Sequence, residues 1–559
     1  MKESSSVHLF VVRAGLLAAV AAVAIPLSAS AETSATPAPR KIVAQANPVA
    51  SPTPNPLTYR GFFRSYFFTR QNASNNPGTQ FNFSPGAKYN SNGVNQASLN
   101  NAVDVHLDYN FAGGGWYVGG SYFYANPIAG PCTTATSHAK GKPCVTQTPP
   151  NTNPDDTLPG FALSTLPETY LGFKGYGFSG KIGNQLFNSP WAAPYDGTRV
   201  KPAAYQGGDL SYTLNDAWIF EAADMIQFQN RTSNTFNSST LLTSFPAGGG
   251  GMGQNIFVPG GGSIDTNGFF YGRVGYAPKT QPYSINGYFY GVSSLLNMWW
   301  FEGKYTMTTS KIQPYVALQG GYESNAGASY IGKIRSSDIG VQLGANVTPE
   351  VLLTVGFDSI PWQNDNINLP AGVTCSNSTY QVSAKGATLG YFLPGNGGSS
   401  GQAGVCKTNP NGTTNVYYGG WASPYTDNYA ADPLFTTQIT QGMADRRAPG
   451  TSWKVAATYT SHNKRWLFIA SDAWYNYGNA LVAENTNEWN LDGQYHFSQV
   501  TGGRYKGLLL RYRYAQRSES NTYCGAASTS CPAGAAIGSS FLGGLPLFKY
   551  NRAQLEYDF

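Results

Sequence analysis

Seven arginines are spaced so that they share the faces of extended strands. Residues an even number of positions apart lie on one side of a strand, and this holds within the stretches YRGFFRSYFFTR and GLLLRYRYAQR. The seven are Arg60, Arg64 and Arg70 in the first stretch, Arg511, Arg513 and Arg517 in the second, and Arg552 near the C-terminus. A guanidinium binds a carboxylate through two parallel hydrogen bonds, so a row of them could hand an anion from one to the next. The alternative is that these arginines form ion pairs with acids such as Asp104, Asp108, Glu556 and Asp558 and only make the strands that carry them more rigid.

Groups for covalent or metal chemistry are scarce. Beyond residue 31 the histidines are His106, His138, His462 and His496, and no serine lies in a Gly-x-Ser-x-Gly turn. His106 stands between Asp104 and Asp108, but a solvated polar trio explains this spacing better than a metal site does. We therefore expect neither an enzyme nor a bound cofactor or metal.

Six cysteines form three close pairs along the chain: Cys132 and Cys144, Cys375 and Cys406, and Cys524 and Cys531. Six cysteines allow fifteen pairings, and proximity favours these three. Each pair falls within one long connection between expected strands, where an exported protein can form disulfides. Metal binding is the competing interpretation, but the spacings match no zinc pattern.

The strands that carry these residues are indicated by strict alternation. The C-terminal NRAQLEYDF sets Leu555, Tyr557 and Phe559 against Glu556 and Asp558. The stretches SLNNAVDVHLDYNF and NEWNLDGQYHF alternate in the same way. Their polar faces are too polar for the core of a β-sandwich. We interpret them as the wall of an aqueous lumen, and the apolar faces as a surface in lipid.

The composition favours the same fold class. Only 11% of the residues are charged, against about 25% in a typical soluble domain, while Gly (65), Tyr (37) and Phe (30) are abundant. After residue 31 no apolar run reaches the ~18 residues that a membrane helix needs. The net charge of +6 over 559 residues is too small to indicate nucleic-acid binding.

Three segments follow from these patterns. Residues 1–31 have the charged start, the apolar run and the small residues of a signal peptide. Residues 32–56 are rich in Pro and Ala and have no periodicity, which predicts an extended periplasmic tail. Residues 57–559 are predicted to be all-β: a transmembrane antiparallel β-barrel of about 18 strands. We expect the first strand at about 58–69 and the last at about 549–559.

The connections between these strands alternate in length. Short ones include 112–115, 214–216, 278–281, 348–350 and 462–465, and long ones are 71–97, 127–160, 188–206, 231–266, 360–451 and 518–548. Strict alternation of short periplasmic turns with long extracellular loops is typical of bacterial outer-membrane barrels. An even strand number also places both termini at the periplasmic end.

Aromatic residues fall into two predicted groups. Phe62, Tyr66, Tyr170 and Trp300 lie on expected lumen faces, where their rings could guide a saccharide. Trp116, Trp299, Trp453, Trp466 and Tyr557 lie on expected lipid faces, as residues of the interfacial girdles. A saccharide channel is thus one alternative to an anion channel. A surface receptor or adhesin is another, motivated by the Gly-rich stretch FPAGGGGMGQNIFVPGGG.

Several stretches resemble the OprD family of substrate-specific outer-membrane porins. They are YDGTRVKPAAYQGG (195–208), DPLFTTQITQGMADRRAPGTSWKVAATYT (432–460), EWNLDGQYHF and KGLLLRYRYAQR. The resemblance is patchy and runs from roughly Tyr59 to Phe559. It implies an 18-stranded barrel, a constriction formed by inward-folding third and seventh loops, and a row of basic residues along the wall.

The resemblance also implies which loop residues line the constriction. From the third loop, taken as 188–206, they are Tyr195, Asp196, Arg199, Lys201 and Tyr205; from the seventh they are Asp432, Thr436, Asp445, Arg446 and Arg447. The final aromatic residue, with apolar residues two and four positions before it, resembles the signal read by the machinery that inserts outer-membrane barrels.

These observations predict a porin of the bacterial outer membrane for passive, selective diffusion of small carboxylate-bearing solutes, such as amino acids, small peptides or organic acids. The expected partners are outer-membrane lipid and lipopolysaccharide, the insertion machinery and the solutes. The sequence leaves open which solute passes, whether the pore is open at rest, and whether the chain is a monomer or a homotrimer.

Overall fold

The structure is a computed structural model. It describes residues 56–72, 96–111, 115–129, 162–194, 199–231, 233–242, 265–368, 382–383, 386–387, 391, 406–426, 432–478, 485–497, 507–520 and 547–559. The predicted signal peptide and almost all of the predicted tail lie outside these residues, as do five of the six cysteines. Cys406 lies in a described strand, but its side chain is not described. The described residues include no helix long and apolar enough to cross a membrane.

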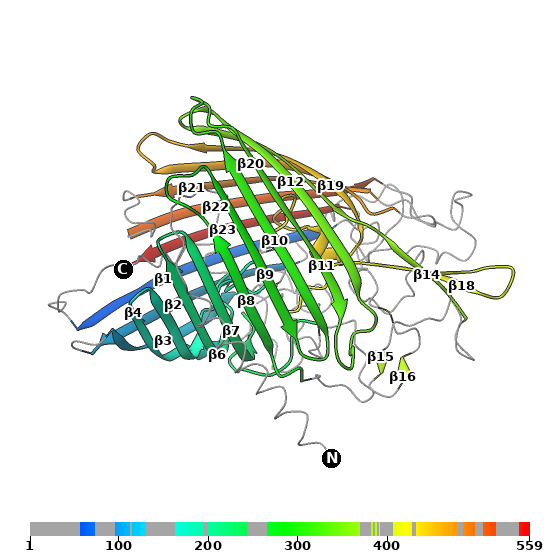
Figure 1. The fold of residues 1–559 in the computed structure, drawn as a ribbon. Coiled ribbons are helices and arrows are strands. Elements are labelled where there is room, and N and C mark those ends of the chain that lie inside the picture. Colours follow the sequence, from blue (N-terminus) through cyan, green and yellow to red (C-terminus); the bar gives the residue numbers. More distant parts are fainter. Residues whose placement is uncertain are drawn as a thin grey trace, which may run out of the picture.

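One antiparallel sheet of 18 strands dominates the fold. Its strands, in chain order, are β1(Leu57–Asn72), β2(Gln96–Asn110), β3(Trp116–Ala129), β4(Leu163–Gly175), β5(Phe178–Gln185), β6(Ala204–Leu214), β7(Trp218–Gln229), β8(Phe269–Tyr276), β9(Tyr283–Val292), β10(Leu296–Thr306), β11(Tyr315–Asn325), β12(Arg335–Thr348), β13(Val351–Ile360), β19(Gly450–Thr460), β20(Trp466–Asn476), β21(Asn485–His496), β22(Gly507–Ser520) and β23(Leu547–Asp558). Each pairs with the next, and β1 pairs with β23, so the sheet closes into the predicted barrel (Figure 1).

Alternation along each strand sorts side chains between the two faces of the wall. In β23, Leu555 and Tyr557 are 40% and 49% exposed, whereas Gln554 and Glu556 are 1% and 0% exposed. The exposed set is apolar and therefore faces outward, because an apolar outer band is what lipid requires. The five aromatic residues expected in the girdles are all exposed on this outer wall: Trp116, Trp299, Trp453, Trp466 and Tyr557.

The connections at the two ends of the barrel differ in length, although less strictly than the sequence predicts. At one end they are short turns such as 215–217, 349–350 and 461–465. At the other end lie the long connections 73–95, 130–162, 186–203, 230–268, 361–449 and 521–546, close to the predicted bounds. Three connections at this end are also short: 293–295, 326–334 and 477–484. The expectation of strict alternation is therefore wrong. At 293–295 the left-handed Ser294 (φ 59) lets the chain reverse within a tight hairpin.

The connection 361–449 carries structure of its own. Strands β14(Gln363–Ile367), β18(Thr414–Tyr418) and β17(Cys406–Thr408) form a small antiparallel sheet, which Figure 1 shows beyond the ends of the barrel strands. β15(Val382–Ser383) and β16(Gly386–Ala387) pair with each other, and α2(Met443–Arg446) is a single helical turn. The Gly-rich stretch that motivates the receptor hypothesis lies outside the described residues.

The largest buried cluster lies inside the barrel. It joins inward-facing residues of β6 to β10 to residues of three long connections, including Trp191, Leu242 and Trp421. Loop residues can be buried there only if the loops fold into the lumen. The core of this protein is therefore a lumen partly filled by its own loops.

Candidate functional site

Six of the seven predicted arginines have described side chains, and by the alternation of each strand they face the lumen. They are Arg60 and Arg64 on β1, Arg511, Arg513 and Arg517 on β22, and Arg552 on β23. Arg64 and Arg552 are 0% and 1% exposed, while Phe63 and Tyr512 beside this row are exposed on the outer wall. β1, β23 and β22 are consecutive in the ring, so the six residues occupy one side of the lumen. We call this set the arginine face. Arg70 lies in β1, but its side chain is not described.

Carboxylates pair with much of the arginine face. Arg64 Nε donates to Glu556 Oε2 at 2.6 Å, across the seam between β1 and β23. Arg511 donates to both oxygens of Asp492, at 2.9 and 2.5 Å, and Arg513 Nε donates to Asp492 Oδ2 at 2.6 Å. Glu556 is one of the acids that the sequence offers as a partner, whereas Asp492 was missed. Two guanidinium groups share this one carboxylate, so the cluster of Asp492, Arg511 and Arg513 carries a net positive charge.

A second cluster of polar residues lies on the same side of the lumen, near the end of the barrel that has the short turns. His106 is completely buried, and its ring nitrogens lie 2.9 Å from Glu168 Oε2 and 3.0 Å from Asp108 Oδ1. Arg60 Nη2 lies 3.1 Å from the same imidazole, and Tyr170 donates to Asp108 at 2.9 Å. His106 is thus held in a buried hydrogen-bonded network with Asp108 and Glu168. The expectation of a solvated trio with Asp104 and Asp108 is wrong in this respect, because Glu168 on β4 packs over the imidazole and the ring is 0% exposed.

The described parts of loop 3 (residues 186–203) contact two sides of the lumen. Near its start, Trp191 N donates to Tyr290 Oη on β9 at 3.2 Å. Near its end, Arg64 Nη1 donates to the carbonyls of Arg199 and Val200 at 2.7 and 3.0 Å. β9 and β1 lie far apart in the ring, so the loop bridges two separate sectors of the wall. This is the arrangement that an inward-folding third loop requires.

The predicted loop 3 residues have different surroundings. Tyr195 and Asp196 lie outside the described residues. Arg199 and Lys201 are buried inside the barrel, at 4% and 1% exposed. Lys201 Nζ donates to the carbonyls of Pro202 and Asn230 at 3.0 and 3.1 Å, and burial lowers the pKa of this ammonium to about 7.

The predicted end of the third loop at residue 206 is wrong, because β6 begins at Ala204 and therefore includes Tyr205. The tyrosine ring is completely buried and packs against Phe228 at 5.3 Å between ring centroids. The pairing of β6 with β5 extends to Tyr205 opposite Gln185, so the strand starts earlier than its loop-like sequence suggests.

Loop 7 is the connection 361–449, and its described segment 432–449 lies against a different part of the wall. Thr436 N and Oγ1 donate to Asp358 Oδ2 on β13 at 2.8 and 2.7 Å. Thr440 N donates to Glu488 Oε1 on β21 at 2.9 Å, and Lys454 Nζ on β19 donates to the carbonyl of Thr437 at 2.6 Å. Bonds to three strands fix this segment against the inner wall.

The other predicted loop 7 residues lie in or near the same segment. Asp432 is buried, and its Oδ1 accepts from Leu434 N at 3.1 Å. Arg447 is 1% exposed and has a left-handed backbone (φ 49) where α2 ends. Asp445 and Arg446 lie in α2, but their side chains are not described.

The described part of loop 4 (residues 230–268) also folds inward, which the sequence did not predict. Its Asn230 carbonyl accepts from Lys201 of loop 3, and Leu241 N donates to the Pro424 carbonyl of loop 7 at 2.8 Å. Leu241 and Leu242 are both buried, at 3% and 0% exposed. The adjacent leucines were the available sequence signal, but it was a weak one, because the connection also contains other apolar residues such as Phe236 and Phe245.

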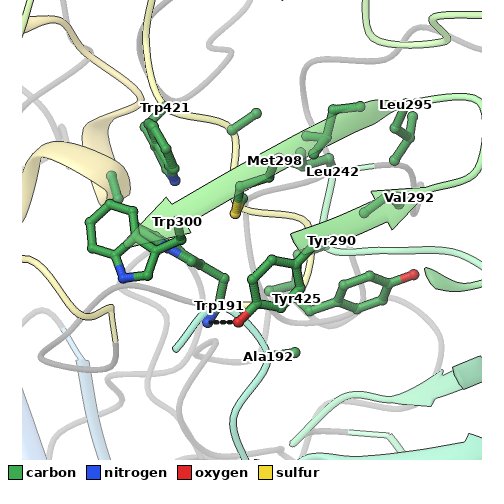
Figure 2. Packing of buried hydrophobic residues seen from close by; sticks show 14 of the residues in the cluster. Trp191, Ala192, Leu242, Tyr290, Val292, Leu295, Met298, Trp300, Trp421 and Tyr425 are labelled. Carbon is green, nitrogen blue, oxygen red and sulfur yellow. Dashed lines mark hydrogen bonds between the residues drawn. The ribbon is translucent and has the colours of Figure 1, made fainter. Parts of the chain in front are cut away.

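Aromatic rings hold loops 3 and 7 together against the wall. Trp191 of loop 3, Trp300 of β10 and Trp421 of loop 7 are mutually in contact, with ring centroids 5.2 to 5.6 Å apart. Figure 2 shows the three rings beside Met298 and Tyr290, with the bond from Trp191 N to Tyr290. All three indoles are 1% exposed or less, so they form packing contacts rather than an open aromatic surface.

Buried acids gather in another sector of the lumen. Glu323 on β11, Asp338 on β12 and Asp358 on β13 are 0%, 6% and 0% exposed. Ala422 N of loop 7 donates to Glu323 Oε2 at 2.7 Å. The three strands are neighbours in the ring, and several other strands separate them from β22, β23 and β1. We call the three residues the acidic sector.

Comparisons with known proteins give the fold. No protein-family model matches the chain, and no curated protein sequence matches it. Among solved structures, it is similar to the outer membrane protein OpdK of Pseudomonas aeruginosa, solved with vanillate (12% identity, TM-score 0.54, covering 90% of this chain and 98% of that one). This chain has the fold of a porin. A BenF-like porin of Pseudomonas fluorescens Pf-5 (11%, TM-score 0.55, 90% and 98%) and OccK2 (OpdF) of Pseudomonas aeruginosa, solved with glucuronate (10%, TM-score 0.54, 90% and 98%), share this porin fold.

Proposed function

We propose that the chain is an outer-membrane porin through which small carboxylate-bearing solutes diffuse passively. The arginine face carries this proposal, because it sets six guanidinium groups along one side of the lumen of a closed barrel. Fixed charge on a pore wall selects the solutes that pass. Two proteins with a similar fold were solved with the carboxylates vanillate and glucuronate, which supports the proposed class of solute.

The more accessible arginines are the expected contacts for a solute. The side chain of Arg60 is 31% exposed and that of Arg511 is 12% exposed. A solute carboxylate competes with Asp492 for Arg511, so binding is weak enough to be reversible. The buried Arg64 and Arg552 act through their charge and through the loops and rings that they hold.

The acidic sector does not narrow the class of solute. Glu323, Asp338 and Asp358 are at most 6% exposed, so they offer a solute no direct contact. The proposal therefore rests on the arginine face and includes amino acids and organic acids alike.

The test is the conductance of the purified barrel in planar lipid bilayers. We expect ion channels with an anion bias, measured as the reversal potential in a salt gradient. The Arg511→Ala/Arg513→Ala variant should lose most of this bias. The control is Lys279→Ala/Lys311→Ala, which removes two charges from the turns outside the lumen. An unchanged reversal potential in the arginine variant would reject the role of the arginine face, and an absence of channels would reject the porin itself.

Liposome swelling separates the classes of solute. We expect swelling to be faster with small amino acids than with oligosaccharides. The saccharide hypothesis requires accessible rings, yet Phe62, Tyr66, Tyr170 and Trp300 are 5%, 0%, 6% and 0% exposed. Faster swelling with oligosaccharides would contradict the proposal.

A further inference from the structure

A groove of about 350 Å³ lies on the outer wall of the barrel, away from the lumen. The residues that line it include Ala457, Tyr459, Phe468, Ala470, Gly493 and Tyr512. The large members are exposed: Tyr459 by 41%, Phe468 by 45% and Tyr512 by 50%. These are outward positions of β19 to β22, so the groove faces the bilayer.

Small residues create the hollow. Ala457 of β19 lies opposite Ala470 of β20, and Gly493 of β21 lies opposite Phe468. A side chain at Gly493 would meet the Phe468 ring at 3.2 Å, so this ring lies beside the glycine. Larger side chains surround this floor of two alanines and a glycine, which gives an apolar depression in the wall.

The turn between β19 and β20 is basic and lies beside the groove. The turn consists of residues 461–465 and includes His462, Lys464 and Arg465. It is only a few positions along the chain from the groove residues Tyr459 and Phe468. Within the described part of the chain, no carboxylate forms an ion pair with Lys464 or Arg465. In another turn, by contrast, Lys279 is bound to Asp216 at 2.8 Å. In the turn 461–465, the His462 ring lies 3.9 Å from Glu350.

The backbone of this turn is tightly held. Lys464 N donates to the Ser461 carbonyl at 2.7 Å, and Arg465 N donates to Asn463 Oδ1 at 3.1 Å. Lys464 has a left-handed backbone (φ 56), which glycine or asparagine adopts more readily than lysine does. A cation is therefore present at a position where the local conformation favours another residue type.

We propose that the groove and this turn bind one anionic glycerophospholipid, with an acyl chain on Ala457, Ala470 and Gly493 and the phosphate at Lys464. Arg465 lies opposite the buried His496, on the other face of the wall from Trp466, so it adds positive charge to the turn without contacting the lipid. The charge and the position of the turn identify the occupant, because a lipid in the leaflet at the turn end brings its phosphate to the height of these cations. Anionic lipids bind basic residues next to a membrane by electrostatic attraction. The proposal goes beyond the proposed function, since it requires a barrel in a bilayer but no conduction.

Native mass spectrometry of the delipidated full-length protein tests the proposal, with phosphatidylglycerol and phosphatidylcholine as probes. We expect one bound phosphatidylglycerol and at least fivefold lower occupancy by phosphatidylcholine. Ala470→Phe fills the groove and should lower phosphatidylglycerol occupancy at least fivefold. Lys464→Ala/Arg465→Ala, which changes only an exposed turn, should remove the preference for phosphatidylglycerol.

Two control variants keep the result specific. Val274→Phe adds the same ring on the outer wall at β8, and Lys311→Ala removes a cation from a different turn; both should bind phosphatidylglycerol like the unmodified protein. Equal occupancy by the two lipids in the unmodified protein would overturn the proposal. So would unchanged binding in both the groove and the turn variants. If Ala470→Phe instead separates oligomers without changing the lipid count, the groove is an interface between copies of the chain and the proposal is wrong.

Discussion

Arg64 and Glu556 form a fully buried ion pair at the seam where the barrel closes, with Arg64 Nε 2.6 Å from Glu556 Oε2. The same guanidinium donates from Nη1 to two carbonyls of loop 3. One side chain therefore links the seam of the barrel to loop 3.

Glu556→Gln should destabilise the barrel. It leaves the Arg64 charge buried without its counter-ion, and removing one partner of a buried pair costs about 3–5 kcal/mol. The free energy of unfolding, measured by urea titration in lipid vesicles, should fall by that amount. The control is Glu350→Gln in an exposed turn, which should change it by less than ~1 kcal/mol.

A second pair of replacements separates the ion pair from the loop contact. Arg64→Met/Glu556→Leu removes both charges, and such replacements are often close to neutral in stability. Loop 3 would still lose its two bonds from Arg64, so single-channel recordings should show larger current fluctuations. Normal recordings with recovered stability would show that Arg64 does not hold the loop.

Asp492→Asn should strengthen anion selectivity. Asp492 is the shared partner of Arg511 and Arg513, so its neutralisation raises the local net charge by one. The reversal potential in a salt gradient should shift further toward anions, opposite in sign to the shift in the Arg511→Ala/Arg513→Ala variant. Glu350→Gln removes an acid outside the lumen and serves as the control. A shift toward cations would mean that the arginines do not act on the permeating ions.

The two faces of the barrel wall were predictable from the sequence because apolar and polar residues alternate along each strand. Phe63 and Arg64 are adjacent, and alternation alone assigns one to the outer wall and one to the lumen. The partner of an arginine was harder to predict, because it depends on register. Asp492 lies opposite Arg513 on the neighbouring strand, and one residue of slip would move every side chain of the strand to the other face.

The loops were less predictable because backbone atoms make many of their contacts. Arg64 binds the carbonyls of Arg199 and Val200, which any residue at those positions would supply. The resemblance to known porins indicated that loops 3 and 7 fold inward, but loop 4 carried no such signal. Its burial rests on Leu241 and Leu242, whose environment depends on Pro424 and its neighbours far along the chain.

Trp421→Ala should loosen loop 7. The Trp421 ring is completely buried against Trp191 and Trp300, and replacing a large buried aromatic with alanine typically costs about 3–5 kcal/mol. We expect lower stability and a higher mean conductance, because the loop no longer packs against the wall. Trp453→Ala removes an indole that is 53% exposed on the outer wall, and it should leave conductance unchanged. If both replacements change the mean conductance equally, the cluster of Trp191, Trp300 and Trp421 does not hold loop 7 in place.

Lys201 should make anion selectivity depend on pH near neutrality. Burial lowers the pKa of its ammonium to about 7, so the group is mostly neutral at pH 8 and mostly charged at pH 6. Protonation adds a positive charge where loops 3 and 4 meet, and the anion bias should therefore rise as the pH falls through 7. Lys201→Met should abolish this step and keep the weaker bias at both pH values. Lys201→Arg, which stays charged, should show the stronger bias at pH 8 as well as at pH 6. A pH step of the same size in all three proteins would show that another group titrates, since neither replacement can change protonation in this range.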